Sequence, residues 1–135
     1  YKPHLLKSVK NTETGAVVRE GSPVVEEKIK MSDSTLKAVK GGMKKVTEEG
    51  TAKSAFKDFD IAVGGKTGTA EVPNGSSNGI FVAFAPFDNP EIAVAIVLEH
   101  GGHGSAAAPI ARAIFETYFE NNGIEDMYLQ HVLLK

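Results

Sequence analysis

Residues 64–71 read GGKTGTAE and combine three glycines, two threonines and one lysine. The glycines leave the backbone bare, so that a ligand can approach the main chain closely. Lys66 offers a positive charge, and Thr67 and Thr69 offer hydroxyl donors. In a strand, alternation places Lys66 on one face and the two threonines on the other, unless the strand bulges or twists. The stretch therefore predicts a strand that binds an anionic group, most simply a carboxylate.

Three interpretations of this stretch compete. Residues 65–67 match the end of a phosphate-binding loop, but Asp60 stands where that loop requires glycine, and residues 68–73 are poor helix formers. A Lys-Thr-Gly triplet also lies on the active-site strand of penicillin-recognising serine enzymes, and residues 63–72 have strand-like ends. The third interpretation is a glycine-rich edge strand without any ligand. Because three residues recur by chance, the triplet alone leaves the last two interpretations open.

The composition is that of one globular domain, for which we expect neither a metal nor a cofactor. The 135 residues are 41% hydrophobic and 24% charged, and the net charge of -2 with scattered lysines argues against a nucleic-acid partner. No cysteine is present, so disulfides and thiolate metal sites are excluded. His100 and His103 lie in a glycine-rich loop and are expected to face solvent, and the spacing of the four histidines does not suit a metal. No apolar run has the length of a membrane span, and the strand-like start at Tyr1 suggests a piece of a longer protein.

The first half of the chain predicts short extended pieces and one helix. Residues 1–9, 16–19 and 24–31 have extended sequences that turn-like residues separate. Ser32 is the expected N-cap of a helix that ends near residue 49. Gly41 and its glycine neighbour lower the stability of this helix, which is tolerable if another element crosses closely there. The expected apolar stripe consists of Leu36, Val39, Met43 and Val46.

The second half predicts three strands and a second helix. The strands are expected over residues 63–72, 80–85 and 92–98. On the third strand, the smaller face of Ala93, Ala95 and Val97 is expected to accept the helix that follows. That helix is expected to begin at Ser105 as N-cap and to stop at residues 121–123, which read NNG. Its expected buried stripe consists of Ala107, Ile110, Ala111, Ile114 and Tyr118, with Phe115 and Phe119 beside it.

This order of elements predicts an α+β fold, an antiparallel meander of three main strands with helices packed on it. With the strands placed, the chain resembles the C-terminal part of the transpeptidase domain of class B penicillin-binding proteins, the elongation-type enzymes that cross-link peptidoglycan. The resemblance covers about residues 1–119 and implies a penicillin-binding/β-lactamase-like transpeptidase fold. Residues 1–135 are then an incomplete C-terminal portion of that domain. The matching pieces are YKPHLL at 1–6, KTGTAE at 66–71, FAP at 84–86 with DNP at 88–90, and GSAAAPIA at 104–111.

The resemblance implies a serine acyltransferase that carries Ser-x-x-Lys, Ser-x-Asn and Lys-Thr-Gly in this order. Lys66 then takes part in catalysis through the proton network and also binds the carboxylate of the substrate. Thr67 and Thr69 hydrogen-bond the carboxylate of the peptide or of a β-lactam. The backbone N–H of Thr69 forms one half of the oxyanion hole, and Gly68 leaves space for the acyl group.

The nucleophile is expected to be missing from this chain. Residues 34–37 and 54–57 match Ser-x-x-Lys as text, but Ser34 lies at a helix start and Ser54 in a loop, both too near the motif strand. Ser76 begins a Ser-x-Asn match that comes after Lys-Thr-Gly instead of before it. We interpret all three serines as chance matches, because short patterns recur. The isolated chain is therefore expected to be inactive.

The expected partners are the peptidoglycan stem peptide, β-lactam antibiotics and the upstream part of the same transpeptidase domain. The edge of the third strand, residues 92–98, is expected to be unpaired and to support self-association. The resemblance implies the extracytoplasmic face of the bacterial cell membrane, with an N-terminal anchor outside this chain. Two alternatives stay open, a non-catalytic sensor domain that binds β-lactams or peptides, and a β-lactamase fragment, which shares the fold but hydrolyses the acyl-enzyme.

Overall fold

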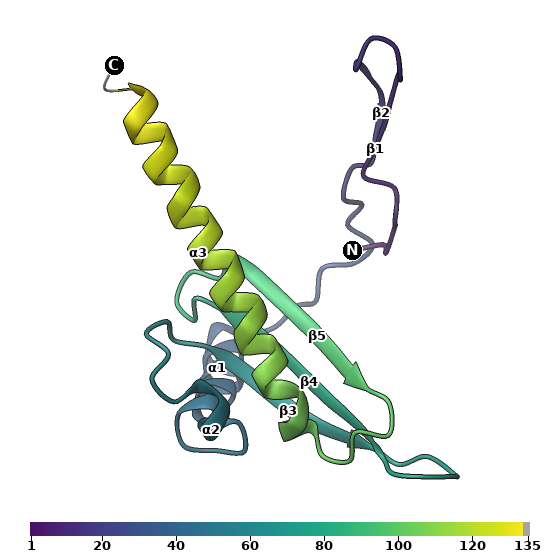
Figure 1. Cartoon of the computed structure of the whole chain (residues 1–135). Helices are drawn as coiled ribbons and strands as arrows, with labels where there is room; N and C mark the ends of the chain where they lie inside the picture. The colour runs from purple at the N-terminus through teal and green to yellow at the C-terminus, as the bar shows by residue number, and fades with distance from the viewer. Residues whose placement is uncertain (134–135) are drawn as a thin grey trace. The chain divides into compact units, whose positions relative to one another are not determined.

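The computed structural model describes residues 1–133, with side chains described up to Glu120 (Figure 1). The chain divides into two compact units, one formed by residues 1–33 and the other by the rest of the chain. Within the described part, no helix has the combination of length and apolar character that a membrane span requires.

The first unit is a small hairpin. Strands β1 (Ser8–Lys10) and β2 (Val17–Glu20) overlap two of the extended pieces predicted from the sequence, and they pair antiparallel. The turn is closed by Asn11, whose Oδ1 accepts the backbone N–H groups of residues 13 and 14, both at 2.9 Å. The extended piece predicted over residues 24–31 does not form a strand in the described chain. Its apolar side chains are exposed, so there is no buried face to hold it in a ladder.

The second unit begins with two helices. Helix α1 (Asp33–Glu48) starts after Ser32, as predicted, but Leu36 and Val39 of its apolar stripe are about half exposed. In the described residues no other element crosses closely at Gly41, since a Cβ added there would meet no atom within 4 Å, so this glycine remains a cost to the helix. A short helix, α2 (Lys53–Phe56), follows and buries Phe56.

The sheet is the predicted antiparallel meander. Strands β3 (Gly64–Ala70), β4 (Asn78–Ala85) and β5 (Ile92–Leu98) lie in the order β3-β4-β5. The central strand β4 carries the largest core side chain of the sheet, Phe81, which is fully buried. Both β3 and β5 are therefore edge strands in the described chain, with β4 as their shared neighbour.

A short 3-10 turn, η1 (Gly104–Ala107), leads into helix α3 (Ala108–Leu133), which runs across one face of the sheet (Figure 1). The helix lies on the face that includes Phe81 and, by register, Ile96, and not on the predicted small face of β5. The prediction was wrong because the small residues that allow close packing belong to the helix, so the sheet contributes its face of large residues to the contact. Three alanines of η1 and α3, Ala107, Ala108 and Ala111, are fully buried against the large residues of the sheet.

The two ends of this helical segment also differ from the prediction. Helical structure begins at Gly104, one residue before the predicted N-cap Ser105. The predicted stop at residues 121–123 is wrong, because α3 continues to Leu133. Asparagine and glycine lower helix propensity by only about 1 kcal/mol or less each, so they do not by themselves end a helix. Ile110 and Ile114 of the predicted buried stripe are exposed, while Phe115, which was placed beside that stripe, is fully buried.

Candidate functional site

The motif strand β3 has the predicted alternation. Its register with β4 is regular, with Lys66 opposite Val82 and Thr67 opposite Phe81. Thr67 and Thr69 therefore share the face of the sheet that α3 covers, and Lys66 extends from the other face. Because β3 is an edge strand, its outer edge borders both faces and can be reached from either.

Two of the three glycines serve packing instead of a ligand. A Cβ added to Gly64 would lie 2.5 Å from Cζ of Phe84, and one added to Gly65 would lie 2.7 Å from Cζ of Phe81. The expectation that these glycines bare the backbone for a ligand is wrong, because the two aromatic rings occupy that space. Gly68 differs, since its added Cβ would meet only Ile80, at 3.4 Å or more. Gly68 is thus the glycine of the motif that leaves room beside the strand.

A pocket of about 280 Å³ lies against the threonine face of β3. Its lining brings together three of the predicted site residues, Thr67, Gly68 and Thr69. The hydroxyl of Thr67 is 2.9 Å from the hydroxyl of Thr51, which precedes α2. The other lining residues come from the η1 segment and are His103, Gly104 and Ser105.

Lys66 is the predicted site residue that does not line this pocket. Its side chain is exposed, and its Nζ donates a hydrogen bond to the backbone carbonyl of Thr67. The described residues therefore do not bring the lysine and the threonine hydroxyls into one cleft. The outer edge of β3 is the place from which both are accessible.

Sequence reasoning did not find Thr51, His103 or Ser105 as pocket residues. Thr51 lies 16 positions before Thr67, and His103 comes after Thr67 with strands β4 and β5 between them. No local sequence pattern therefore links Thr51 or His103 to the motif. Both His100 and His103 are exposed, as predicted. His100 is held at the loop between β3 and β4, where its Nδ1 lies 3.0 Å from the carbonyl oxygen of Ser76.

The three serines with motif-like spacing lie apart from the pocket lining. Ser34 is in the first turn of α1, and Ser54 lies in α2, a helical turn in place of the loop given to it from the sequence. Ser76 lies in the loop before β4. All three are exposed, and none is among the residues that line the pocket beside Thr67.

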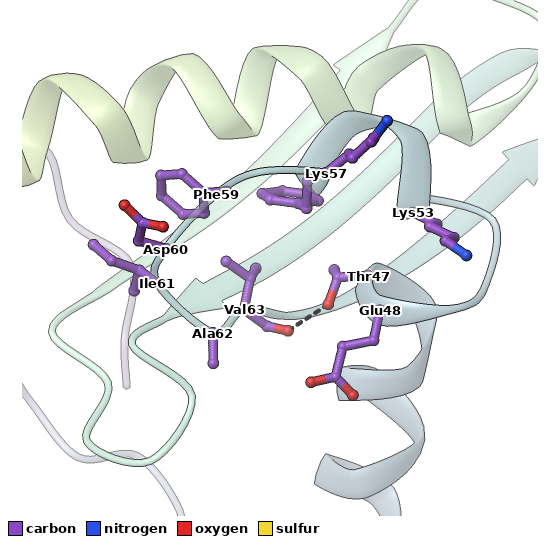
Figure 2. A pocket seen from close by; sticks show the side chains of 10 residues that line it. Thr47, Glu48, Lys53, Lys57, Phe59, Asp60, Ile61, Ala62 and Val63 are labelled. Carbon is purple, nitrogen blue, oxygen red and sulfur yellow. Dashed lines mark hydrogen bonds between the residues drawn. The ribbon is translucent and has the colours of Figure 1, made fainter.

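A second hollow, of about 410 Å³, lies where α1 and α2 meet the start of β3 (Figure 2). Figure 2 shows the bond that closes one side of it, in which the Thr47 hydroxyl donates to the carbonyl oxygen of Val63 at 2.6 Å. Thr47 is 5% exposed, and its methyl carbon lies 3.4 Å from a Cβ added at Gly65. This contact fixes the start of β3 against the end of α1. The charged side chains around the hollow are Glu48, Lys53, Lys57 and Asp60.

The chain is similar to known proteins over most of its length. The family model for the penicillin binding protein transpeptidase domain matches residues 1–116. Peptidoglycan D,D-transpeptidase MrdA of Haemophilus influenzae is 35% identical over 136 residues, which cover 86% of this chain and 20% of that protein. Penicillin-binding protein 2A of Bacillus subtilis is 32% identical over 144 residues, which cover 93% of this chain and 20% of that protein.

A solved structure agrees with the sequence relatives. The D,D-transpeptidase domain of a peptidoglycan glycosyltransferase from Eggerthella lenta is 35% identical with a TM-score of 0.67, and the match covers 87% of this chain and 27% of that one. The chain spans about a fifth of the length of the curated relatives. The matched family, the related enzymes and the shared α+β fold agree with the resemblance described above: the chain belongs to the penicillin-binding protein transpeptidase family, with class B, elongation-type enzymes among its relatives.

Proposed function

We propose that this chain supplies the carboxylate-binding strand of a peptidoglycan D,D-transpeptidase, a serine acyltransferase whose nucleophile lies in another part of the protein. One observation carries the proposal. The Lys-Thr-Gly motif lies on an edge strand, and the hydroxyl-bearing face of that strand borders a pocket. An edge strand offers a ligand both its side chains and its unpaired backbone groups, and the resemblance implies a peptide substrate or a β-lactam that carries a carboxylate.

In this mechanism the chain binds the carboxylate of the substrate and stabilises the oxyanion, while the serine outside this chain attacks the peptide bond. The terminal carboxylate of the stem peptide lies along β3 and accepts hydrogen bonds from Thr67 and Thr69. As the serine oxygen attacks the peptide carbonyl, the N–H of Thr69 donates to the oxyanion that forms. Gly68 leaves room for the acyl group. The positive charge of Lys66 attracts the carboxylate and also takes part in the proton transfers that activate the serine. A β-lactam enters through the same contacts and acylates the same serine.

Two observations support a nucleophile outside this chain. The serines that match Ser-x-x-Lys as text, Ser34 and Ser54, do not line the pocket beside Thr67. The curated relatives are long enough to hold the missing elements, because this chain spans about a fifth of them. From the similarity to peptidoglycan transpeptidases we also propose that the full-length protein acts at the extracytoplasmic face of the bacterial membrane, with its anchor outside these residues.

Labelling with a fluorescent penicillin tests this proposal. The isolated chain is expected to show no covalent label, because it lacks the attacking serine. The full-length protein is expected to be labelled, and the label is expected to resist denaturation because it is an ester. Mass spectrometry of the labelled peptide identifies the serine. Label on Ser34 or Ser54 of the isolated chain contradicts the proposal, and reversible binding without a covalent label in the full-length protein indicates a sensor domain. Rapid release of the label points to a β-lactamase.

The outer edge of β5 is a second functional surface of the isolated chain. Among the described residues β5 pairs with β4 alone, and Val97 on this strand is 63% exposed. An unpaired, apolar edge strand promotes pairing with another chain. We propose that the upstream part of the domain covers this edge in the full-length protein, and that copies of the isolated chain associate through it.

The isolated chain is therefore expected to form dimers or larger species in sedimentation velocity experiments. Replacing Val97 by lysine places a charge on the exposed edge strand and is expected to shift the chain to a monomer without loss of its fold. Lys45→Met, on an exposed face of α1, is the matched control and leaves association unchanged. A wild-type chain that sediments as a single monomer, with rapid amide hydrogen exchange over residues 92–98, contradicts this proposal.

A further inference from the structure

We propose that Thr51 is a positioning residue, whose hydroxyl orients the hydroxyl of Thr67 toward the carboxylate of the substrate. This inference rests on the function proposed above and deepens it, because it adds a residue outside the Lys-Thr-Gly motif to the carboxylate site. The observation behind it is the distance of 2.9 Å between the two hydroxyl oxygens, at the wall of the pocket that Thr67 and Thr69 line.

The backbone around Thr51 is fixed on both sides. Before it, the Thr47 hydroxyl binds the carbonyl of Val63 at 2.6 Å, so the end of α1 is tied to the start of β3 (Figure 2). After it, Ala52 is fully buried and its N–H donates to the carbonyl of Val46 at 3.0 Å. Thr47 thus contacts Val63 just before β3, and Thr51 contacts Thr67 within β3. The hydrogen bonds of Thr47 and Ala52 hold the backbone on either side of Thr51 without its own bond to Thr67.

Helix α3 holds this segment from the other side. The Arg112 guanidinium donates to the carbonyl oxygen of Ala55 at 3.2 Å and to that of Lys57. Its Nε also donates to Glu116 at 2.7 Å, and the guanidinium lies 5.5 Å from the centre of the Phe59 ring. The turn that carries Thr51 is therefore attached to both the sheet and the C-terminal helix, as a positioning residue requires.

The chemistry of two adjacent hydroxyls explains the proposed role. Each hydroxyl has one proton to donate and can accept hydrogen bonds. If Thr51 donates to the oxygen of Thr67, the proton of Thr67 is left to donate elsewhere, and an acidic ligand in the pocket is its best acceptor. The chain Thr51 O–H to Thr67 O–H to carboxylate is then cooperative, since each donor polarises the next. Without Thr51, the Thr67 hydroxyl is free to rotate and loses part of its interaction with the ligand.

The test compares two ligands in the full-length protein. Thr51→Val removes the hydroxyl and keeps the shape, whereas Thr51→Ser keeps the hydroxyl. We measure the second-order rate of acylation by a penicillin and by its methyl ester, which has no free carboxylate. Thr51→Val is expected to lower the rate for the penicillin about three- to tenfold, the effect of one hydrogen bond, and to leave the ester rate unchanged. Thr51→Ser is expected to restore the wild-type rate, and Thr117→Val on α3 is a control in which both rates stay unchanged.

A double-variant cycle shows whether Thr51 acts through Thr67. In a Thr67→Val background, Thr51→Val is expected to have no further effect, because the hydroxyl that it orients is gone. Equal loss for the penicillin and the ester, or full additivity with Thr67→Val, overturns the positioning role. A wild-type penicillin rate in Thr51→Val also overturns it. The proposed function fails on a different result, namely a Thr67→Val replacement that lowers the rates for the penicillin and for its ester by the same factor, or lowers neither.

Discussion

Replacing Lys66 by methionine is expected to lower the rate at which penicillin acylates the full-length protein by about a hundred- to a thousandfold, the usual effect of losing one preorganised charge-stabilising group. The methionine keeps the length and the apolar stem of the side chain and removes only the charge. Because Lys66 is exposed on its face of β3, the replacement removes no core contact of this unit. A loss of rate without a change in thermal stability therefore reports on the site.

Lys45→Met is the matched control for this variant. Lys45 is exposed on α1 and lies 3.5 Å from Glu49, a surface ion pair of small energetic value. Its replacement is expected to leave the acylation rate unchanged. A Lys66→Met protein that is labelled as fast as the wild type would remove the lysine from the proposed site.

The methyl ester of the penicillin separates the two roles given to Lys66. If the lysine only binds the carboxylate, its replacement has no effect on acylation by the ester. If it also serves the proton transfers of the serine, the ester reacts more slowly as well. We expect both reactions to slow, because Lys66 lies on the opposite face of β3 from the threonine hydroxyls. That position allows the lysine to face the missing serine while the threonines face the pocket.

Local features of this fold were predictable, and features that depend on cross-strand register were not. The three strands, the helix after Ser32 and the alternation of Lys66 with Thr67 follow from short patterns of apolar, polar and turn residues. The face that α3 covers depends on which face of β5 aligns with Phe81, and a shift of one residue reverses it. Both faces of β5 are apolar, so the alternation within the strand does not by itself decide between them.

The same limit applies to the site. Thr67, Gly68 and Thr69 are neighbours in the chain, so a strand brings them together without any tertiary contact. Thr51 and His103 reach the pocket only through the packing of α2 and η1 against the sheet. Gly64 and Gly65 show a further ambiguity, because a sequence does not reveal whether a bare backbone receives a ligand or an aromatic ring.

Replacing Phe81 by alanine is expected to lower the free energy of unfolding of the chain by about 3–5 kcal/mol, the range for removing a large aromatic side chain from a core. Phe81 is fully buried and stacks on Phe56 with ring centres 6.1 Å apart. The helix α3 and the ring share one core cluster, so the cavity lies where helix and sheet meet. Urea denaturation followed by circular dichroism measures the loss. Val82→Ala, next to it on the opposite face, is the control and is expected to lower stability by less than about 1 kcal/mol because the side chain is already exposed.

A replacement at Gly65, the residue before the Lys-Thr-Gly motif, tests whether this glycine is needed to make room for the Phe81 ring. Gly65→Ala places a Cβ 2.7 Å from Cζ of Phe81, and the overpacking is expected to lower the free energy of unfolding by about 1–3 kcal/mol. In a Phe81→Ala background the ring is absent, so the same replacement is expected to have a much smaller effect. An equal loss in both backgrounds would mean that the added methyl group is crowded by another neighbour, such as the Thr47 methyl carbon at 3.4 Å. If Gly65→Ala instead lowers stability only slightly and equally in both backgrounds, but greatly lowers the acylation rate, the space beside Gly65 is needed for the ligand. The cycle therefore decides whether the bare backbone at Gly65 makes room for the Phe81 ring or for the ligand.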